Sequence, residues 1–407
     1  MGVAMTIRKT CIVCGEEKLY QALDLGLMPS SNDLPKKDAL NLVKEYELRY
    51  YMCPKCGLFQ LLEVADRLDL FDNYLYLTGV NRELVAHFKE LYENIGTQDS
   101  KKDFAVVVGS NDGTEVSLLK EYGKFKNVIG VEPAKNIANM ANSAGRTTIN
   151  DFFSLKTSQK IVEEYGKADL VVANNVFAHI PDPRDMLEGM KNLINEDGRI
   201  IIEVHWLKSI VEELEIETLY AEHYYVWTVK AMNVLSKQLG MKIIEVLYMP
   251  KQHGGSLRFT FAYSGTNDLA LMENEKNAGL YEKSTMELLQ KRAEDRKNKL
   301  KYLIREINKQ GKRVSIWSVP AKVPTLINYC GFTDKDIGCA YEVAESKIGR
   351  YIPKANIPIK EESLIEEDKP DYLIIGAWNY MDFAIKKLKW FTDSGGKLIN
   401  PLTAEIL

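Results

Sequence analysis

Long apolar runs are absent from this sequence of 407 residues. Nowhere do about 18 apolar residues follow one another, so no membrane-spanning helix is predicted. Residues 1–10 lack the apolar core of a secretory signal. Basic residues are not in excess either, because 53 Lys and Arg stand against 57 Asp and Glu, for a net charge of −4. This balance predicts no general nucleic-acid surface. We therefore expect a cytoplasmic protein whose partner is a small molecule, with neither nucleic acid nor membrane bound.

Cysteine is scarce, with six in the whole chain, and this argues against a secreted disulfide scaffold, which is short and dense in cysteine. Four of the six form two C-x-x-C pairs, Cys11 with Cys14 and Cys53 with Cys56. The two-residue spacer lets both thiolates of a pair face one ion, and two pairs complete the tetrahedral shell that structural zinc prefers. Four unrelated buried cysteines are one alternative; a redox pair is another, but it would explain only one of the two pairs. The predicted zinc is structural, since four protein ligands leave no open position.

Apolar strand patterns alternate with helical patterns along most of the chain and indicate three domains, at 1–80, 81–265 and 266–407. Such alternation predicts crossover connections and parallel sheets that are buried on both faces. A long charged amphipathic helix is expected at 285–310, before the strands of the third domain. The expected strands of the central domain are 104–108, 127–131, 169–173 and 198–204, followed by an antiparallel hairpin of 241–249 with 256–264. Those of the last, smaller α/β domain are 313–318, 337–343, 371–375 and 397–400.

A glycine-rich turn, GSNDG at 109–113, lies between the first central strand and a helix. Its glycines permit close approach of a ligand, and the helix N-terminus offers free N–H groups. Glu132 ends the next strand, where its carboxylate can accept hydrogen bonds from both hydroxyls of a ribose. The dinucleotide pattern G-x-G-x-x-G is not met, because Asn111 and Thr114 stand where its later glycines belong. The turn therefore favours S-adenosylmethionine over NAD, while a plain βα turn with a chance glutamate stays open. The candidate cofactor residues here are Gly109, Asn111, Asp112, Gly113 and Glu132.

These motifs, in this order, resemble the sugar C-methyltransferases that act on nucleotide-linked 4-keto-deoxyhexoses. The resemblance covers nearly the whole chain, and its later strings are specific because few other families combine them. Besides the cysteines and the turn, it rests on Tyr74-Leu-Tyr76, Glu132-Pro133, Asp151-Phe152-Phe153, Asn174-Asn175-Val-Phe-Ala-His179, Tyr220-Ala-Glu222-His223, His253-Gly254-Gly255-Ser256-Leu-Arg258, Lys347-Ile-Gly-Arg350-Tyr351 and Ala377-Trp378-Asn379.

The resemblance implies an α/β protein with a zinc-ribbon-like N-terminal module, a central doubly wound class I methyltransferase sheet and a smaller Rossmann-like C-terminal domain. It implies an S-adenosylmethionine-dependent C-methyltransferase whose active site lies between the last two domains. A base would remove the proton beside the ketone of a TDP-sugar, and the enolate would take the methyl group. By resemblance the base is His223, and its neighbours are Tyr76, His179, Tyr220 and Glu222. The resemblance also adds Asp151, Phe152 and Asn174 to the cofactor site.

The chemistry of these residue types supports that assignment independently. Deprotonation beside a carbonyl needs a base with a pKa near neutral, which histidine provides. Tyrosine hydroxyls can donate to the enolate oxygen, and Glu222, if it lies in a turn, can hold the imidazole tautomer. For 220–223 the alternative is an exposed polar turn, and for His179 a structural role stays open. His205 matches no motif, and we expect it to be structural.

The predicted substrate site combines a glycine pair with cationic side chains. Gly254 and Gly255 permit approach of a phosphate, and Arg258 offers a bidentate fork for it. The alternative is a solvated basic patch. The predicted substrate residues are His253, Gly254, Gly255, Ser256, Arg258, Lys322, Lys347, Arg350 and Tyr351.

Two positions depart from the family pattern. Relatives carry an acidic residue two before the first glycine of the turn, where it helps to hold the methionine end of the cofactor, and this chain has Val107. In the C-terminal domain a glycine-rich G-A-x-x-K-G turn is replaced by WSVPAKVP at 317–324, which keeps Lys322 but loses both glycines. Two other hypotheses therefore stay open: a relative that binds a ligand without transferring methyl groups, and an O- or N-methyltransferase acting on another small molecule.

Overall fold

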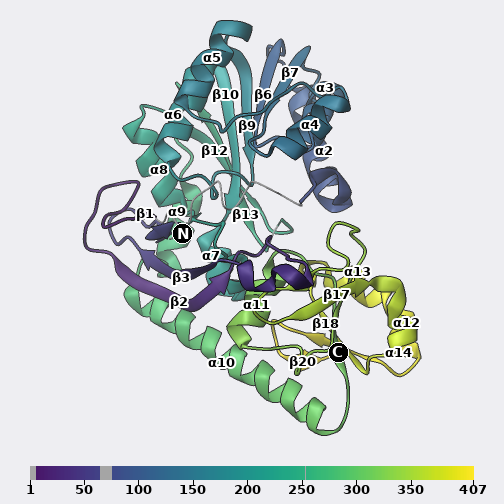
Figure 1. The fold of residues 1–407 in the computed structure, drawn as a ribbon. Helices are drawn as coiled ribbons and strands as arrows, with labels where there is room; N and C mark the ends of the chain where they lie inside the picture. Colours follow the sequence, from purple (N-terminus) through teal and green to yellow (C-terminus); the bar gives the residue numbers. More distant parts are fainter. Residues whose placement is uncertain (1–5, 65–75, 253) are drawn as a thin grey trace.

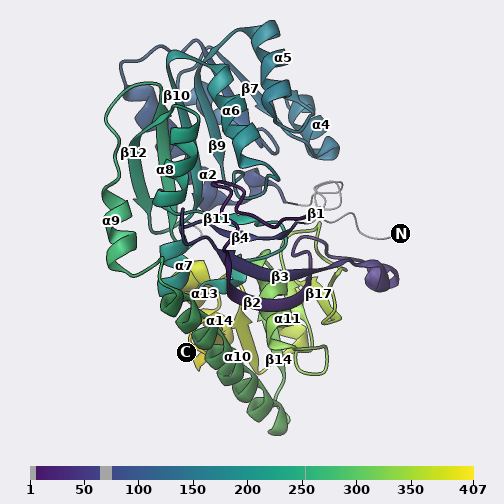
Figure 2. The ribbon, with the colours of Figure 1, turned by 90° about the vertical axis from the view of Figure 1, so that its left-hand side faces the viewer.

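The computed structural model describes residues 6–64, 76–252 and 254–407, so Tyr74 and His253 lie outside the described residues. It contains a four-stranded sheet from the N-terminal region and two seven-stranded sheets. The central domain lies above the C-terminal domain in Figure 1, and the N-terminal strands lie between them in both views (Figures 1 and 2). No helix in the described part of the chain is long and apolar enough to cross a membrane.

The central sheet has the strand order β12-β13-β10-β9-β6-β7-β8. Its five strands from β8 to β10 are parallel, and β13 is antiparallel to both β10 and β12. The strands are β6 (Phe104–Val108), β7 (Asn127–Val131), β8 (Thr148–Ile149), β9 (Ala168–Asn174), β10 (Ile194–His205), β12 (Lys242–Met249) and β13 (Ser256–Ala262). Every residue of β6 and β9 is buried, as a strand covered on both faces requires. The predicted doubly wound sheet and its closing hairpin are confirmed.

Helices cover both faces of this sheet. In Figure 1, α2, α3 and α4 lie on one side and α5, α6 and α8 on the other. The helices are α2 (Arg82–Thr97), α3 (Thr114–Glu121), α4 (Lys135–Ser143), α5 (Leu155–Tyr165), α6 (Pro183–Leu193), α7 (Leu207–Glu213), α8 (Val229–Gln238) and α9 (Ala270–Asn277), with the 3-10 turns η2 (Thr78–Val80) and η3 (Ile216–Thr218). The carboxyl ends of β6, β7, β9 and β10 therefore meet at one edge, where ligands bind in such folds.

The N-terminal sheet is completed by a strand from the central domain. Its order is β11-β4-β3-β2, formed by β2 (Tyr20–Pro29), β3 (Glu45–Met52), β4 (Phe59–Leu61) and β11 (Tyr225–Val226). A separate pair joins β1 (Thr6–Ile7) to β5 (Glu63–Val64), and η1 (Lys37–Leu42) precedes β3. Because β11 begins two residues after His223, the segment that carries the predicted base is hydrogen-bonded to the cysteine module.

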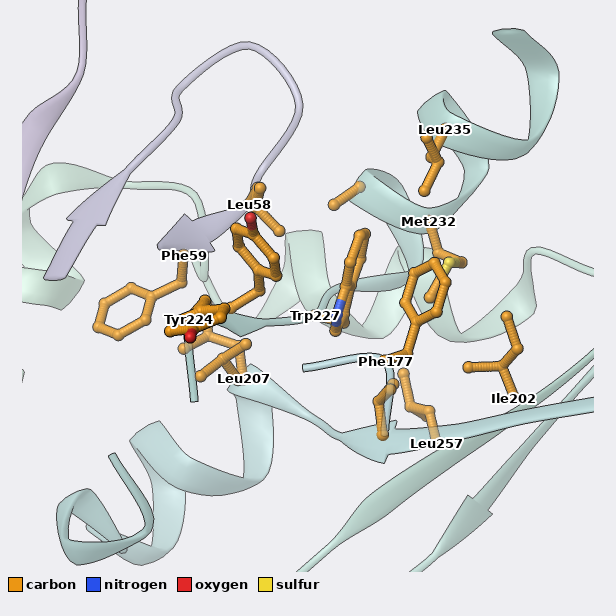
Figure 3. Close-up of a cluster of buried hydrophobic side chains, with 14 of the residues drawn as sticks. Leu58, Phe59, Phe177, Ile202, Leu207, Tyr224, Trp227, Met232, Leu235 and Leu257 are labelled. Carbon is orange, nitrogen blue, oxygen red and sulfur yellow. The ribbon is translucent and has the colours of Figure 1, made fainter. Parts of the chain in front are cut away.

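One apolar core joins this module to the central domain. Figure 3 shows Leu58 and Phe59 of the module beside Tyr224, with Trp227 next along the cluster. Trp227 is fully buried and its ring lies 5.0 Å from that of Phe177 in the central domain. The two units therefore share buried surface, which stabilises their relative placement.

The C-terminal domain begins with α10 (Lys283–Lys309), which confirms the predicted long helix and packs against both β2 and α11 (Lys322–Cys330). Its sheet order is β16-β17-β15-β14-β18-β19-β20. The strands are β14 (Val314–Trp317), β15 (Ala340–Glu342), β16 (Tyr351–Ile352), β17 (Ile357–Glu361), β18 (Tyr372–Ile375), β19 (Lys397–Asn400) and β20 (Glu405–Ile406). The remaining helices are η4 (Glu362–Leu364), α12 (Ile365–Asp368), η5 (Trp378–Tyr380), α13 (Met381–Lys387) and α14 (Lys389–Asp393).

Candidate active site

The four N-terminal cysteines form one cluster. Their Sγ atoms all lie within 4.8 Å of one another, and the shortest contacts cross between the pairs, at 3.5 Å for both Cys11–Cys56 and Cys14–Cys53. Each pair sits in a tight turn closed by a glycine in the left-handed region, Gly15 and Gly57. Because all four sulfurs face one point, the cluster favours a single tetrahedral metal site over a redox pair. An all-thiolate donor set fits zinc.

Three aromatic rings gather around His223 at the edge where β9 and β10 end. The Tyr220 ring stacks on the imidazole of His223 at 4.0 Å, and the rings of His179 and His205 lie 4.6 and 4.9 Å from it. His223 is only 3% exposed, so the exposed-turn alternative for 220–223 is wrong. His205, which we expect to be structural, ends β10 and lies against the predicted base. Its position at the carboxyl end of a parallel strand could have predicted from the sequence that His205 lies near the site.

The backbone sets the tautomer of His223. Its Nδ1 faces the carbonyl oxygen of Thr218, which can only accept, so Nδ1 carries the hydrogen and Nε2 carries the lone pair. The carbonyl of His223 accepts from the Tyr50 hydroxyl of β3 at 2.7 Å. His179 Nδ1 donates to the carbonyl of Glu222 at 2.9 Å. The imidazole is therefore held in the form that can accept a proton at Nε2.

The predicted role of Glu222 is wrong. Its Oε1 accepts from the Ser30 hydroxyl at 2.6 Å and from the backbone and side-chain nitrogens of Asn32 at 3.1 Å. The carboxylate thus faces the segment after β2 rather than the imidazole, which Thr218 orients instead. Neighbouring side chains in this turn diverge, and Glu222 anchors the N-terminal segment behind the site.

We expect Glu222→Ala to lower the free energy of unfolding by about 2–3 kcal/mol, because one buried and two partly buried donors lose their acceptor. Thermal denaturation measures this change. Ser30→Ala is the matched control and should cost about 1 kcal/mol, since it removes one of the three donors. Equal stability of wild type and Glu222→Ala would contradict the anchoring role.

The side chains of the glycine-rich turn hold the segment before it. Asn111 accepts from the amide of Thr78 at 2.8 Å and donates to the carbonyl of Tyr76 at 3.1 Å. Asp112 accepts from the amides of Thr114 at 3.1 Å and Gly79 at 2.9 Å. Asn111 and Asp112 therefore place η2 and Tyr76 over the turn, and Gly109 and Gly113 both have the positive φ that the turn requires.

Glu132 lies beneath this turn at the end of β7. Its two oxygens accept from the amides of Asn111 at 3.0 Å and Ala134 at 2.8 Å, and burial raises the pKa of its carboxyl. Among the described residues, the Ser110 hydroxyl and the Asn174 amide oxygen are buried without a hydrogen-bond partner. Buried polar atoms of this kind require a partner, so this edge fits a polar ligand. Asp151 and Phe152 follow β8 at the same edge and are partly exposed.

The glycine pair meets an acidic side chain instead of an open surface. A Cβ atom on Gly254 would lie 1.7 Å from a carboxylate oxygen of Glu215, and one on Gly255 would lie 2.3 Å from the Ser209 hydroxyl. Lys322, at the start of α11, interacts with Glu215 across the domain boundary, and its amine lies 4.4 Å above the ring of Trp378. Burial lowers the pKa of Lys322 to about 8 and raises that of Glu215 to about 7.

The other predicted substrate residues are divided among three places. Lys347 donates to the carbonyl of Val319 at 2.8 Å, so it joins the altered turn 317–324. The Arg350 guanidinium donates to the carbonyl of Leu34 at 2.8 Å. The backbone amide of Tyr351 donates to the carbonyl of Pro35 at 3.0 Å. Ser256 is buried at the start of β13 and donates to the carbonyl of Gln252 at 3.2 Å.

Arg258 is not placed with them. It lies directly opposite Glu203 in the pairing of β13 with β10, and both are buried. Its guanidinium donates to Glu203 at 2.9 and 3.0 Å and lies 2.9 Å from the His87 ring. The prediction that Arg258 binds a substrate phosphate is corrected by this buried cross-strand pair. The single glutamate within the apolar run 200–204 could have predicted this buried pair from the sequence.

Three family models match the chain in order: a zinc binding domain at 11–71, a methyltransferase domain at 92–246 and a C-methyltransferase C-terminal domain at 251–403. C-methyltransferase NovU of Streptomyces niveus is 28% identical over 404 residues, which cover 96% of this chain and 95% of NovU. Among solved structures, magnesium protoporphyrin IX methyltransferase of Synechocystis PCC 6803 is 13% identical, with a TM-score of 0.33 over 45% of this chain and 79% of that chain. An S-adenosylmethionine-dependent methyltransferase of Thermotoga maritima is 17% identical, with a TM-score of 0.32, and the match covers 44% of this chain and 92% of that chain.

Proposed function

Because the chain belongs to the C-methyltransferase family with an N-terminal zinc-binding domain, we propose that it methylates a carbon beside the ketone of a nucleotide-linked keto-sugar. The observation that carries the proposal is the buried imidazole of His223, whose Nδ1–H is held by the Thr218 carbonyl. A base with its lone pair set on one nitrogen is what removal of a carbon-bound proton requires.

Two cofactors complete the protein. The four-cysteine cluster would hold a structural zinc ion, as the thiolate donor set indicates. S-adenosylmethionine supplies an electrophilic methyl group when bound. The turn 109–113 and Glu132 would hold its adenosine portion, and the buried polar atoms beside them fit such a ligand.

His223, the ring stacked on it and Tyr76, which lies over the cofactor turn, each have a task in the proposed reaction. Nε2 of His223 takes the proton, and the Thr218 carbonyl then stabilises the imidazolium through Nδ1–H. The stacked Tyr220 ring also stabilises a cationic imidazole. Burial raises the pKa of Tyr76, so its hydroxyl stays protonated and can donate to the enolate oxygen.

The charges of the substrate site favour the C-terminal domain as the phosphate binder. A carboxylate of Glu215 lies against Gly254 and would repel a phosphate there. Lys322 and Lys347 both belong to the region of the altered turn 317–324, where Lys322 interacts with Glu215 and Lys347 pairs with Glu342 at 3.7 Å. We propose that a nucleotide diphosphate binds these two lysines, in place of their carboxylate partners, rather than the glycine pair.

Incubation with methyl-labelled S-adenosylmethionine and a panel of keto-sugar nucleotides tests the function. The matched controls are the same sugar nucleotides with the ketone reduced to an alcohol, which have no acidic carbon–hydrogen bond. We expect a new carbon–carbon bond, seen by NMR, only with the ketones. Equal labelling of the alcohols at oxygen would identify an O-methyltransferase instead.

Glu132→Ala is expected to weaken binding of S-adenosylhomocysteine by roughly 30-fold or more, equivalent to about 2–4 kcal/mol, because a charge-assisted pair of hydrogen bonds to the ribose is lost. Isothermal titration calorimetry measures the affinity. Glu121→Ala, at the exposed end of α3, is the control and should bind as wild type does. Tighter binding of NAD than of S-adenosylhomocysteine by the wild type would contradict the cofactor assignment.

A further inference from the structure

The carboxylate of Glu115 is buried beside the cofactor turn with only neutral partners. Glu115 lies in the first turn of α3 and is 4% exposed. Its Oε2 accepts from the side-chain amide of Asn174 at 2.6 Å and from the hydroxyl of Tyr92. No Lys, Arg or His among the described residues forms an ion pair with it, whereas the neighbouring Glu203 is paired with Arg258. A buried carboxylate without a cation is costly unless a ligand supplies one.

The Glu115 carboxylate lies on the same face of the sheet as Val107, the position where relatives carry an acidic residue. Val107 precedes the first glycine by two residues, and its side chain is buried in the same cluster as Tyr92. Because Glu115 is bonded to Tyr92, its carboxylate lies on the face of the sheet that Val107 faces. Strand β6 ends in three valines, so no carboxylate reaches this place from the strand itself. The helix that follows the turn brings one there instead.

The second acceptor at this place is Asn174. Its amide nitrogen is used by Glu115, and its amide oxygen is buried with no partner among the described residues. An ammonium group presents three N–H donors and requires acceptors of this kind. A carboxylate and an unpaired amide oxygen side by side therefore define a site for a primary ammonium.

We infer that Glu115 and Asn174 bind the α-ammonium of the methionine portion of S-adenosylmethionine, and that Glu115 replaces the carboxylate absent at position 107. This inference rests on the proposed function, since it concerns the same cofactor. Glu115 would position the cofactor, because the ammonium that it binds lies at the far end of the ligand from the adenine.

The surrounding charges agree with a cationic ligand. The groups near Glu115 are Tyr92, Glu203, Arg258 and, beyond them, His87 and Tyr76. Arg258 and His87 both contact Glu203, and neither forms an ion pair with Glu115. Burial raises the pKa of Glu115 to about 7. Since an ammonium binds the ionised carboxylate, affinity for S-adenosylhomocysteine should fall as the pH decreases below about 7.

Calorimetry with two ligands tests the assignment. S-adenosylhomocysteine carries the α-ammonium, whereas 5′-methylthioadenosine lacks the amino-acid portion. Glu115→Gln keeps the shape and an acceptor for Tyr92 and Asn174 but removes the charge. We expect it to bind S-adenosylhomocysteine about 10- to 100-fold more weakly and 5′-methylthioadenosine within about twofold of wild type. Glu132→Ala is the matched control, because loss of a ribose contact should weaken both ligands.

Equal loss of both ligands in Glu115→Gln, or no change in either, would overturn the inference. A measurement on the wild type alone guards against a variant that does not fold: an S-adenosylhomocysteine analogue with hydrogen in place of the α-ammonium should bind at least about tenfold more weakly. Equal affinity for the analogue would also overturn the assignment. Failure of the wild type to bind either adenosine ligand would refute the proposed function itself, a result distinct from the loss of ammonium recognition alone.

Discussion

His223→Asn is expected to reduce methyl transfer by about 10²- to 10⁴-fold, the usual size of a general-base contribution. The substitution removes the lone pair at Nε2 but keeps an N–H that can donate to the Thr218 carbonyl, as Nδ1 does in the wild type. The loop that joins η3 to β11 should therefore keep its conformation. For that reason we expect affinity for S-adenosylhomocysteine to remain near the wild-type value, so the loss should fall on the chemical step.

Exchange of the substrate's α-hydrogen in heavy water isolates this step. With S-adenosylhomocysteine in place of the methyl donor, the wild type should exchange the hydrogen and His223→Asn should not. His205→Asn and His179→Asn are the matched controls, since both rings contact His223 without sharing its bond to Thr218. Normal exchange in His223→Asn would assign the base elsewhere, with His179 and Tyr76 as the next candidates.

Removal of zinc is expected to unfold the N-terminal module and to abolish activity, although no cysteine belongs to the proposed reaction site. Structural zinc in small domains contributes about 10–16 kcal/mol of apparent binding free energy, so the module should not survive its loss. Two contacts transmit the effect: β4 pairs with β11, and Tyr50 of β3 holds the carbonyl of His223. One face of the central sheet has a core that is separate from the module, and we expect the sheet to persist.

Cys56→Ser and treatment with a chelator provide the measurement. Metal analysis should find one zinc ion per wild-type chain and less in the variant, and limited proteolysis should cut first within the module. Cys330→Ala is the matched control, because this buried cysteine lies in the C-terminal domain and should leave the zinc content unchanged. Freshly purified wild-type protein without zinc would count decisively against the metal site.

Local patterns in the sequence were sufficient for the elements and for the metal site. Strands β6 and β7 have the predicted bounds, because continuous apolar runs between charged residues encode buried parallel strands. Helix α10 begins and ends within two residues of its prediction. The cysteine spacing determines which thiols can share an ion, since the two residues between them set the reach of each pair. The resemblance to the family, and no periodic pattern in the sequence, identified His223 as the candidate base.

Only the tertiary structure decided which side chains meet. Glu222 and His223 are neighbours in sequence, yet one binds Ser30 and the other Thr218, because a turn sends adjacent side chains in different directions. His205 joins the ring cluster although it lies eighteen residues before His223, since the end of β10 and the loop after η3 meet at one edge of the sheet. Such contacts depend on how distant strand ends assemble, and short-range pattern does not encode that assembly. The sequence thus determined the elements and the ligand types, and the packing of the sheet edge determined their partners.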